Sequence, residues 1–449
     1  MKPALPQGTR DFSAEVIRKR RFILDTIREV FELYGFEPLE TPAMENLETL
    51  TGKYGEEGDK LIFKILNNGL DNSAKREEIK KGFEKILEGK NDAGITERAL
   101  RYDLTIPFAR YVAMNFPKLT VPYKRYQMQP VWRADRPQKG RYREFYQCDA
   151  DIAGTTSLIS DAELALIYLQ VFKKLRVDVE VKINNRKILS ALAEVCNAAD
   201  QLNTITVAID KLDKIGIEKV KEELLERGLN NNQVAVIEKY LNISGSNSEK
   251  IRQAKNLLGE NETGKKGIVE IGNILNLTSD IVIDFTLARG LNYYTGIIYE
   301  VKARNVSIGS IGGGGRYDDL TGLFGLPNIP GVGISFGVDR IYDVMTELNI
   351  FPETLNTSTK ILLFNLGEKE SLVAFAAMQQ LRDNGISCEI FYENAKMDRQ
   401  FKYANRKNIA YAVIIGSREL EQQTCIIKDL EKEEQQTVSI KDLLSYFNK

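Results

Sequence analysis

The chain has 449 residues, 43% of them hydrophobic, with 62 Lys and Arg against 63 Asp and Glu. Because folding units usually contain roughly 100–200 residues, we expect more than one domain. The formal net charge of −1 excludes a strong overall field that would attract a polyanion. Any nucleic-acid surface must therefore be local.

The sequence contains no histidine, and its four cysteines are Cys148, Cys196, Cys388 and Cys425. The lack of histidine removes the commonest general base and metal ligand from any mechanism. The cysteines are too few for a disulfide scaffold and too widely spaced for a CxxC zinc pair, so we expect a reducing, cytoplasmic setting without protein-bound zinc or another metal site. Because no segment resembles a signal peptide or a membrane span, we expect no membrane association.

In chain order, residues 14–34 predict an amphipathic helix that stops at Gly35. Residues 67–97 are polar and interrupted by glycine, which predicts an exposed excursion with one surface helix. Aromatic and β-branched residues around a basic loop over 123–153 predict a hairpin. Ser160 is expected to open a capping box for a helix whose apolar face packs on the sheet.

Residues 185–277 are rich in Lys and Glu and almost wholly helical in pattern, which predicts a separate inserted module. Strand signals return over 281–303. The polar stretch 351–359 contains a proline and is interpreted as a linker. Strands then alternate with helices over 360–449, which predicts a small α/β domain with a mostly parallel sheet.

The densest chemical signal is the segment 124–144, with seven basic residues, two acidic residues and a local charge of +5. The basic residues are Lys124, Arg125, Arg133, Arg136, Lys139, Arg141 and Arg143. Guanidinium groups clamp phosphate oxygens and keep their charge when desolvated, so a polyphosphate partner is expected; charge alone would equally fit a solvated hairpin. The aromatic residues Tyr142, Phe145 and Tyr146 favour the first interpretation, because a purine can stack on such rings.

Five sequence blocks resemble one family. WRADRPQKGRYREFYQ (132–147) resembles the second signature of class II aminoacyl-tRNA synthetases in the form peculiar to histidyl-tRNA synthetases. ARGLNYYTG (288–296) and IGGGGRYDDL (311–320) resemble two further blocks of that family. GFEPLETPAMENLETL (35–50) and GVGISFGVDRI (331–341) are similar to the first and third class signatures. The resemblance therefore spans nearly the whole chain.

This resemblance implies an α+β fold of several domains. Its expected parts are an antiparallel-sheet catalytic core with flanking helices (1–184 and 278–350), an inserted helical domain (185–277), a linker (351–359) and a C-terminal α/β anticodon-binding domain (360–449). It also implies a ligase that activates L-histidine with ATP to histidyl-adenylate and pyrophosphate. The ligase then transfers histidine to the 3′ end of tRNA(His).

The resemblance assigns the ATP site and the catalytic groups. Arg133 would contact the α-phosphate, Arg340 the γ-phosphate, and Phe145 would pack on adenine, with Arg141 also in the ATP site. Arg289 would bridge the histidine carboxylate and the α-phosphate, which makes Arg133, Arg289 and Arg340 the catalytic residues. Fixed arginines suit this reaction because negative charge builds up at the α-phosphorus. Mg²⁺ is expected with the β- and γ-phosphates.

The histidine-binding set that the resemblance implies consists of Asp103, Thr105, Gln147, Asp151, Arg289, Tyr293 and Tyr294. Asp103, Thr105 and Gln147 would bind the α-amino group, whereas Asp151 and Tyr294 would bind the ring. A site with polar partners for both ring nitrogens penalises apolar analogues, because those partners would be left buried and unpaired. Surface acids at strand ends are the alternative for Asp103 and Asp151.

Three further expectations concern the run of glycines, the tRNA and the oligomeric state. The glycines at 312–315 do not match the phosphate-binding pattern GxxxxGK[ST], and we expect them to let the backbone approach bound histidine. Arg136 and Gln138 would meet the acceptor end of the tRNA. The class signature at 35–50 implies a homodimer.

A catalytically silent, regulatory relative of the synthetases is the main alternative. Such proteins generally lack the anticodon-binding domain and lose the catalytic arginines. Here Arg133, Arg289 and Arg340 are all present, and residues 410–430 resemble that domain. We therefore favour the enzyme. The complete absence of histidine also suggests that synthesis of the protein is independent of charged histidine tRNA.

Overall fold

The computed structural model describes residues 2–54, 58–288, 293–355 and 359–448. The chain forms two compact units, Met1–Asp11 with Arg20–Ile350, and Phe12–Lys19 with Phe351–Lys449. Among the described residues, no helix is long and apolar enough to cross a membrane.

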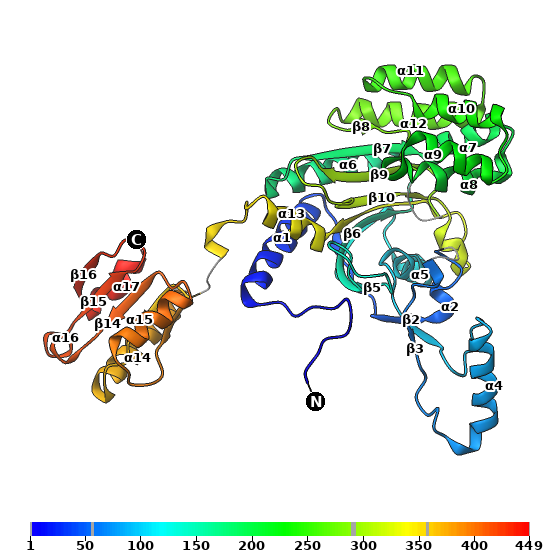
Figure 1. Ribbon diagram of the computed structural model, residues 1–449. Coiled ribbons are helices and arrows are strands. Elements are labelled where there is room, and N and C mark those ends of the chain that lie inside the picture. Colours follow the sequence, from blue (N-terminus) through cyan, green and yellow to red (C-terminus); the bar gives the residue numbers. More distant parts are fainter. Residues whose placement is uncertain (1, 55–57, 289–292, 356–358, 449) are drawn as a thin grey trace. The chain divides into compact units, whose positions relative to one another are not determined.

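The first unit is built on an eight-stranded sheet in the order β1-β5-β6-β11-β10-β9-β7-β8 (Figure 1). In chain order its strands are β1 (Glu37–Pro38), β5 (Tyr123–Trp132), β6 (Glu144–Ala153), β7 (Val179–Asn185), β8 (Val282–Ile283), β9 (Ile297–Ala303), β10 (Gly312–Tyr317) and β11 (Gly331–Gly337). The edge pairs β1–β5 and β7–β8 are parallel, and the central pairs are antiparallel. The antiparallel core and the β5–β6 hairpin confirm the predicted α+β fold.

Two helices, α1 (Ala14–Leu33) and α6 (Leu158–Leu175), pack on the same face of this sheet. The rings of Phe31 on α1 and Phe172 on α6 lie 5.8 and 5.7 Å from the ring of Phe336 on β11. A third helix, α13 (Val338–Glu347), follows β11 directly. These aromatic contacts fix β11, the strand that leads into the pocket described below.

The start of α6 differs from the sequence prediction. Ser157, not Ser160, is the cap, and its side chain accepts a hydrogen bond from the backbone N–H of Ile159. Ser157 is the last residue with extended backbone, whereas Ser160 already lies in the first helical turn and donates to the Ser157 carbonyl. The expected capping box is therefore wrong by three residues, although the buried apolar face of the helix is as predicted.

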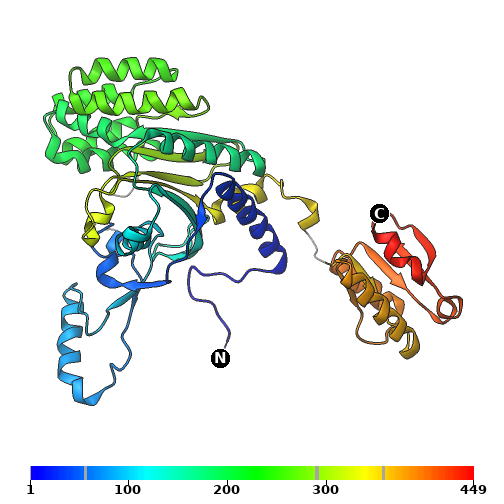
Figure 2. The ribbon, with the colours of Figure 1, turned by 180° about the vertical axis from the view of Figure 1, so that it is seen from behind.

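The predicted excursion forms an arm that stands away from the sheet in both views (Figure 1, Figure 2). It carries η1 (Ser73–Lys75) and α4 (Arg76–Leu87) and is rooted in a small sheet of β2 (Met44–Asn46), β4 (Arg98–Leu100) and β3 (Lys64–Ile65). Beside this sheet lie α2 (Leu47–Leu50), α5 (Thr105–Asn115), η2 (Phe116–Lys118) and η4 (Leu320–Phe324).

The segment that follows β7 is helical, as its pattern predicted. It contains α7 (Arg186–Val195), η3 (Ala199–Gln201), α8 (Leu202–Ile209), α9 (Leu212–Glu226), α10 (Asn231–Leu241), α11 (Asn247–Leu258) and α12 (Glu262–Leu277). Helix α12 packs on β7, β9 and α6, so the segment covers the β7–β8 end of the sheet (Figure 1).

The second unit contains a five-stranded sheet in the order β13-β12-β14-β15-β16. Its elements are η5 (Glu353–Leu355), β12 (Ile361–Leu363), α14 (Glu368–Asp383), β13 (Cys388–Ile390), α15 (Met397–Arg406), β14 (Tyr411–Ile414), α16 (Ser417–Gln422), β15 (Thr424–Asp429), β16 (Gln435–Ser439), η6 (Ile440–Asp442) and α17 (Leu443–Phe447). Strands β13, β12 and β14 are parallel, whereas β15 and β16 are antiparallel. The sheet is therefore mixed and not mostly parallel, because the short connection through α16 returns the chain beside β14.

Candidate active site

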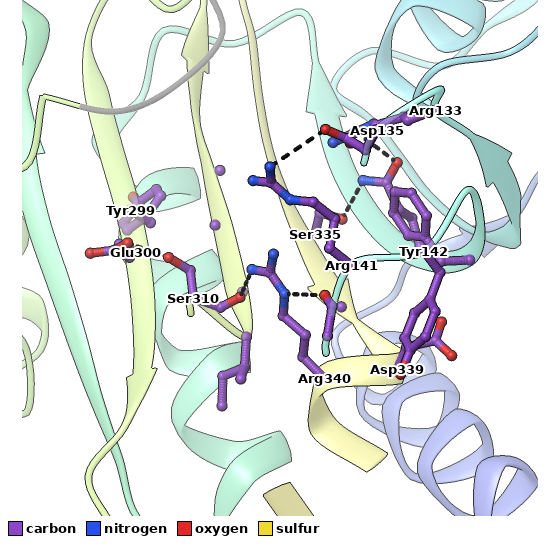
Figure 3. A pocket seen from close by; sticks show the side chains of 18 of the residues that line it. Arg133, Asp135, Arg141, Tyr142, Tyr299, Glu300, Ser310, Ser335, Asp339 and Arg340 are labelled. Atoms are coloured by element: carbon purple, nitrogen blue, oxygen red, sulfur yellow. Dashed lines mark hydrogen bonds and ion pairs between the residues drawn. The ribbon is translucent and has the colours of Figure 1, made fainter. Parts of the chain in front are cut away.

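A cavity of about 380 Å³ lies between the β5–β6 hairpin, strands β9 to β11 and the first turn of α13. Six of the residues that the resemblance assigns to the ATP and histidine sites line it: Arg133, Arg141, Phe145, Gln147, Tyr294 and Arg340. Tyr142 and the glycines at 312–314, also named from the sequence, line it as well. Figure 3 shows the three arginines among these residues, with Tyr299 and Glu300 on the β9 side. The pocket thus combines several fixed cations with aromatic surface, as a nucleotide requires.

Arg133 is held by aromatic rings and one backbone bond. Its Nε donates to the carbonyl of Tyr102 at 3.0 Å, and its guanidinium lies 4.3 Å from the Tyr102 ring and 5.2 Å from that of Phe145. Its Nη2 lies 3.5 Å from Oε1 of Gln147. These contacts orient the guanidinium and leave it at the pocket wall.

Arg340 is fixed by two backbone carbonyls on opposite sides of the pocket. Its Nε donates to Gly140 at 2.8 Å and its Nη1 to Ser310 at 2.6 Å (Figure 3). Arg141 is less constrained, because it is half exposed and its nearest carboxylate partner, Asp135, lies 3.5 Å away. The pocket therefore offers two fixed guanidinium groups, those of Arg133 and Arg340, and one adjustable group, that of Arg141.

The segment interpreted as one basic cluster is divided in the structure. Arg125 is fully buried and forms an ion pair with Asp151 at 2.9 Å, and Lys124 bonds to Glu163 at 2.9 Å. Both lie near the start of β5, outside the pocket-lining set. The alternation of strand β5 turns Arg125 into the core, which a count of local charge does not reveal.

The remaining histidine-binding candidates lie in a buried polar layer beside the pocket. Asp103 accepts hydrogen bonds from the hydroxyls of Tyr54 and Tyr293 at 2.9 and 3.3 Å. Thr105, the first residue of α5, bonds to the Tyr293 hydroxyl. Asp151 accepts a hydrogen bond from the Tyr317 hydroxyl at 2.5 Å.

Burial raises the pKa of all three acids in this layer, Asp103, Asp149 and Asp151. The sequence reasoning missed Asp149, which the structure buries to 2% exposure between Gln127 on β5 and Ser335 on β11. Strand alternation could have identified it, because Gln147, Asp149 and Asp151 share one face of β6.

The remaining residues named from the sequence are the two proposed tRNA contacts, Arg289 and the run of glycines. Arg136 and Gln138 are exposed on the loop of the hairpin and do not line the pocket. Arg289 lies outside the described residues. Glycines 312–315 form most of β10, and a Cβ at Gly315 would lie 2.9 Å from the ring of Tyr294. Glycine at this position therefore makes room for a pocket-lining ring.

A second hollow, of about 410 Å³, lies in the second unit between the end of β13 and one side of α15. It is lined by Ile390, Phe391, Tyr392, Glu393, Arg399, Lys402, Tyr403 and Arg406. Tyr392 is 88% exposed, and the three cations on α15 repeat at helical spacing. An exposed ring beside several cations is suited to an unstacked base and its phosphates.

Comparisons with known proteins agree with this geometry. Residues 91–341 match the family of histidyl-tRNA synthetases, and residues 360–449 match an anticodon binding domain. A histidine–tRNA ligase from Bacteroides fragilis is 50% identical over 456 residues, covering 100% of this chain and 99% of the relative.

Solved structures agree as well. The crystal structure of histidyl-tRNA synthetase from Nostoc sp. PCC 7120 has a TM-score of 0.82 and 32% identity, covering 100% of this chain and 99% of that one. An ATP phosphoribosyltransferase regulatory subunit/histidyl-tRNA synthetase from Bacillus halodurans C has a TM-score of 0.71 at 20% identity, covering 90% and 97%, which shows a shared fold alone.

The fold, the pocket and these matches define an aminoacyl-tRNA synthetase. The chain belongs to the histidyl-tRNA synthetase family.

Proposed function

We propose that the pocket of this aminoacyl-tRNA ligase binds ATP along its arginines and histidine beside its buried acids. The chain then forms histidyl-adenylate and passes histidine to the 3′ end of tRNA(His). The observation that carries this proposal is the pairing of a cationic, ring-lined cavity with a layer of buried carboxylates. Strand β6 connects the two, because it carries Phe145 and Gln147 of the cavity lining and also the buried Asp149 and Asp151.

The arginines account for ATP binding. Arg133 contacts the α-phosphate, Arg340 the γ-phosphate, Arg141 adjusts to the polyphosphate, and Phe145 packs on adenine. Because Arg133 and Arg340 are already held by backbone carbonyls, they need little reorganisation as charge develops on the phosphorus. Arg289 keeps its proposed role between the histidine carboxylate and the α-phosphate.

The buried layer accounts for the amino acid. Asp103, with Thr105 and Gln147, receives the α-ammonium group, while Asp151 and Tyr294 receive the ring. The hydrogen bonds from Tyr54 and Tyr293 already orient the Asp103 carboxylate. A carboxylate oriented in this way discriminates strongly, because an analogue without a donor leaves it buried and unpaired.

The chain has no imidazole of its own to act as a base. The histidine carboxylate therefore attacks the α-phosphorus in its ionised form, with pyrophosphate as the leaving group. In the transfer step, a tRNA hydroxyl attacks the activated carbonyl. Its proton passes to a phosphate oxygen or to a group other than histidine.

Mg²⁺ would accompany the β- and γ-phosphates of ATP. The Glu300 carboxylate lines the pocket and is an oxygen ligand of the kind that this ion prefers. The ion would neutralise phosphate charge. Glu300 also bonds to the Ser310 hydroxyl, which fixes the direction of one of its carboxylate oxygens.

We propose further partners and a location by analogy with the family. Arg136 and Gln138 meet the acceptor end of the tRNA, residues 360–449 bind its anticodon, and two chains form a homodimer through residues 35–50. A cytoplasmic location remains a prediction from a role in translation. Sedimentation that showed only monomers at micromolar concentration would contradict the dimer.

The deciding experiment is histidine-dependent exchange of pyrophosphate into ATP. The ligase should exchange with histidine and not with other amino acids, and should then charge tRNA(His). A folded chain that binds histidine without exchange would instead be the silent regulatory protein.

A further inference from the structure

Residues 6–11, here called the strap, run beside the β5–β6 loop of the pocket. The Pro6 carbonyl accepts hydrogen bonds from the backbone N–H of Thr9 at 3.2 Å and from its hydroxyl at 2.8 Å, which folds residues 6–9 into a turn. The Gly8 carbonyl in this turn accepts the backbone N–H of Arg143 at 2.9 Å. The mechanism above assigns the strap no role.

The turn of the strap packs closely against the loop. Gly8 has a φ of +82°, and a Cβ there would lie 2.8 Å from Cγ of Arg143 and 3.0 Å from Cγ of Pro137. Glycine therefore permits both the left-handed backbone and the close approach. The Arg143 carbonyl accepts the backbone N–H of Arg133 at 3.0 Å. Two successive backbone hydrogen bonds thus join the strap to an arginine of the pocket wall.

Arg10, in the strap, contacts the pocket wall at two points. Its guanidinium carbon lies 3.2 Å from the centroid of the Tyr142 ring, and its Nη2 forms an ion pair with the Asp339 carboxylate. Tyr142 and Asp339 both line the cavity and lie next to one another in Figure 3. A guanidinium suits this bridge, because its flat face stacks on a ring while its edge donates to a carboxylate.

The two contacts of Arg10 adjoin two of the arginines that are proposed to bind the polyphosphate. Tyr142 directly follows Arg141, and Asp339 directly precedes Arg340. Arg141 belongs to the β5–β6 loop and Arg340 to α13, so the local chain geometry does not set the distance between them. Arg10 connects their neighbours and is a second link between these elements, beside the hydrogen bond from Arg340 to the loop.

Asp339 has other partners besides Arg10. Its side chain is 5% exposed and also forms an ion pair with Arg20 on α1, and its Oδ2 accepts the backbone N–H of Tyr146 at 3.3 Å. Loss of Arg10 would therefore leave the carboxylate paired, so the fold should not depend on it. The specific contribution of Arg10 is the connection between Asp339 and Tyr142.

Resting on the proposed function, we propose that Arg10 is a positioning residue for the polyphosphate of ATP. By joining Tyr142 to Asp339, it fixes the distance between Arg141 and Arg340 across the β- and γ-phosphates. Arg10 acts through these neighbours and takes no part in the chemistry itself. The strap is therefore part of the nucleotide site, whereas the histidine side of the pocket rests on other contacts.

The test uses the full-length chain and histidine-dependent pyrophosphate exchange. In Arg10→Ala the KM for ATP should rise about 10-fold, the lower end of the effect of a hydrogen bond to a charged group, because Arg10 acts indirectly. Arg10→Lys should raise this KM less. An ammonium group still pairs with Asp339, but it offers no flat face to Tyr142. Lys2→Ala is the control, because Lys2 is exposed and lies outside the strap, and its KM for ATP should be unchanged.

A second variant displaces the strap while Arg10 is still present. Gly8→Ala places a methyl group against Arg143 and Pro137 and should also raise the KM for ATP. Gly69→Ala is the matched control, because Gly69 has a similar φ of +78° but would have no atom within 4 Å of its Cβ. It should leave the KM for ATP unchanged.

Three further readouts separate positioning of the polyphosphate from a structural role. In Arg10→Ala the KM for histidine and the inhibition constant of AMP, which lacks the β- and γ-phosphates, should stay within about twofold of the parent. The midpoint of thermal unfolding without ligands should also stay near that of the parent. An unchanged KM for ATP, or a parallel rise of all three constants with a lower midpoint, would overturn the proposal. No histidine-dependent exchange by the parent chain would instead reject the proposed function itself.

Discussion

Arg340, in the first turn of α13, donates its Nε to the backbone carbonyl of Gly140 in the β5–β6 loop, at 2.8 Å and across 200 residues of sequence. Its Nη1 donates to the Ser310 carbonyl beside β10. One side chain therefore holds together the three segments that surround the proposed polyphosphate site. In the proposed function its positive charge binds the γ-phosphate, and its hydrogen bonds maintain the shape of the pocket.

Replacing Arg340 should consequently impair both ATP binding and adenylate formation. In Arg340→Ala we expect pyrophosphate exchange to fall by about 10²–10³, the usual loss when one fixed donor is removed from a developing negative charge. Arg340→Lys should retain only a small part of the parent's exchange activity. An ammonium group cannot donate to the Gly140 and Ser310 carbonyls in the planar geometry of a guanidinium.

Lys139 provides the matched control for this prediction. It lies on the same loop and pairs with Glu347, but its side chain is 74% exposed, so the ion pair contributes little. Lys139→Ala should leave exchange unchanged. Equal losses in both variants would mean that loop charge in general, and not the position of Arg340, sustains the activity.

The pKa of Asp149 makes a separate prediction about stability. Burial, assisted by the charge of Asp151, raises the pKa of Asp149 to about 7. The folded chain then holds a proton that the unfolded chain releases near pH 4, so this residue lowers the free energy of unfolding increasingly between about pH 4 and 7. Below this interval, where the group is protonated in both states, the effect is absent.

The isosteric variant Asp149→Asn has no such proton. Without substrate, its thermal midpoint should match that of the parent chain at the low end of this interval and exceed it increasingly toward pH 7. Scanning calorimetry of both proteins over pH 4–8 measures the difference. A difference that does not change with pH would show that Asp149 does not titrate in this interval.

Sequence reasoning predicted the hairpin and its basic loop because both depend on a local pattern, whereas the antiparallel sheet and the roles of the pocket arginines were implied by the family resemblance. The alternation of β5 and β6 and the basic loop between them lie in one continuous segment, so their arrangement follows from hairpin geometry. The cap at Ser157 was missed because Ser160 fits the same local motif, and only the backbone conformation distinguishes the two.

Asp149 was missed, and Arg125 was misjudged, for a different reason. Their environment depends on strand register, which places Asp149 between Gln127 and Ser335 and Arg125 opposite Asp151. Ser335 lies almost 200 residues downstream of Asp149, so no local window contains both partners. The count of charges along the chain assigned Arg125 to the phosphate site. In the fold, Arg125 is instead buried and forms an ion pair with Asp151.

The hollow in the second unit predicts that this unit is needed for aminoacylation of tRNA but not for adenylate formation. If Tyr392 stacks on an anticodon base and Arg406 contacts the phosphates, the double variant Tyr392→Ala/Arg406→Ala should aminoacylate tRNA(His) about 10- to 100-fold less efficiently, since base–aromatic stacking contributes roughly 1–3 kcal/mol. Exchange of pyrophosphate needs no tRNA and should remain normal.

Lys369→Ala is the control for this variant. Lys369 is exposed on α14, which packs with one face of the second sheet, whereas α15 packs with the other. Loss of aminoacylation in both variants would assign tRNA binding to the general charge of the unit. Loss of exchange in the double variant would contradict the separation of the two steps.

The last prediction concerns the absence of histidine from all 449 residues. An enzyme that charges histidine tRNA and itself contains histidine needs its own product for its synthesis, so starvation would reduce the enzyme and then reduce charging further. A chain without histidine is free of this dependence. Drift, or inheritance from a subfamily with tyrosine at position 146, explains single positions better than a count of zero. We therefore expect the composition to sustain synthesis during starvation.

The structure supplies positions at which this hypothesis can be tested without disturbing the pocket. Asn232, Lys239 and Asn256 are exposed on α10 and α11 and do not line the cavity. A triple histidine variant should accumulate less protein than the parent during histidine limitation, while a triple glutamine variant at the same positions should match the parent. Quantitative immunoblotting of pulse-labelled cells measures this, with synthesis in histidine-rich medium as the reference. Equal accumulation of the two variants during limitation would reject the regulatory hypothesis and leave drift as the explanation.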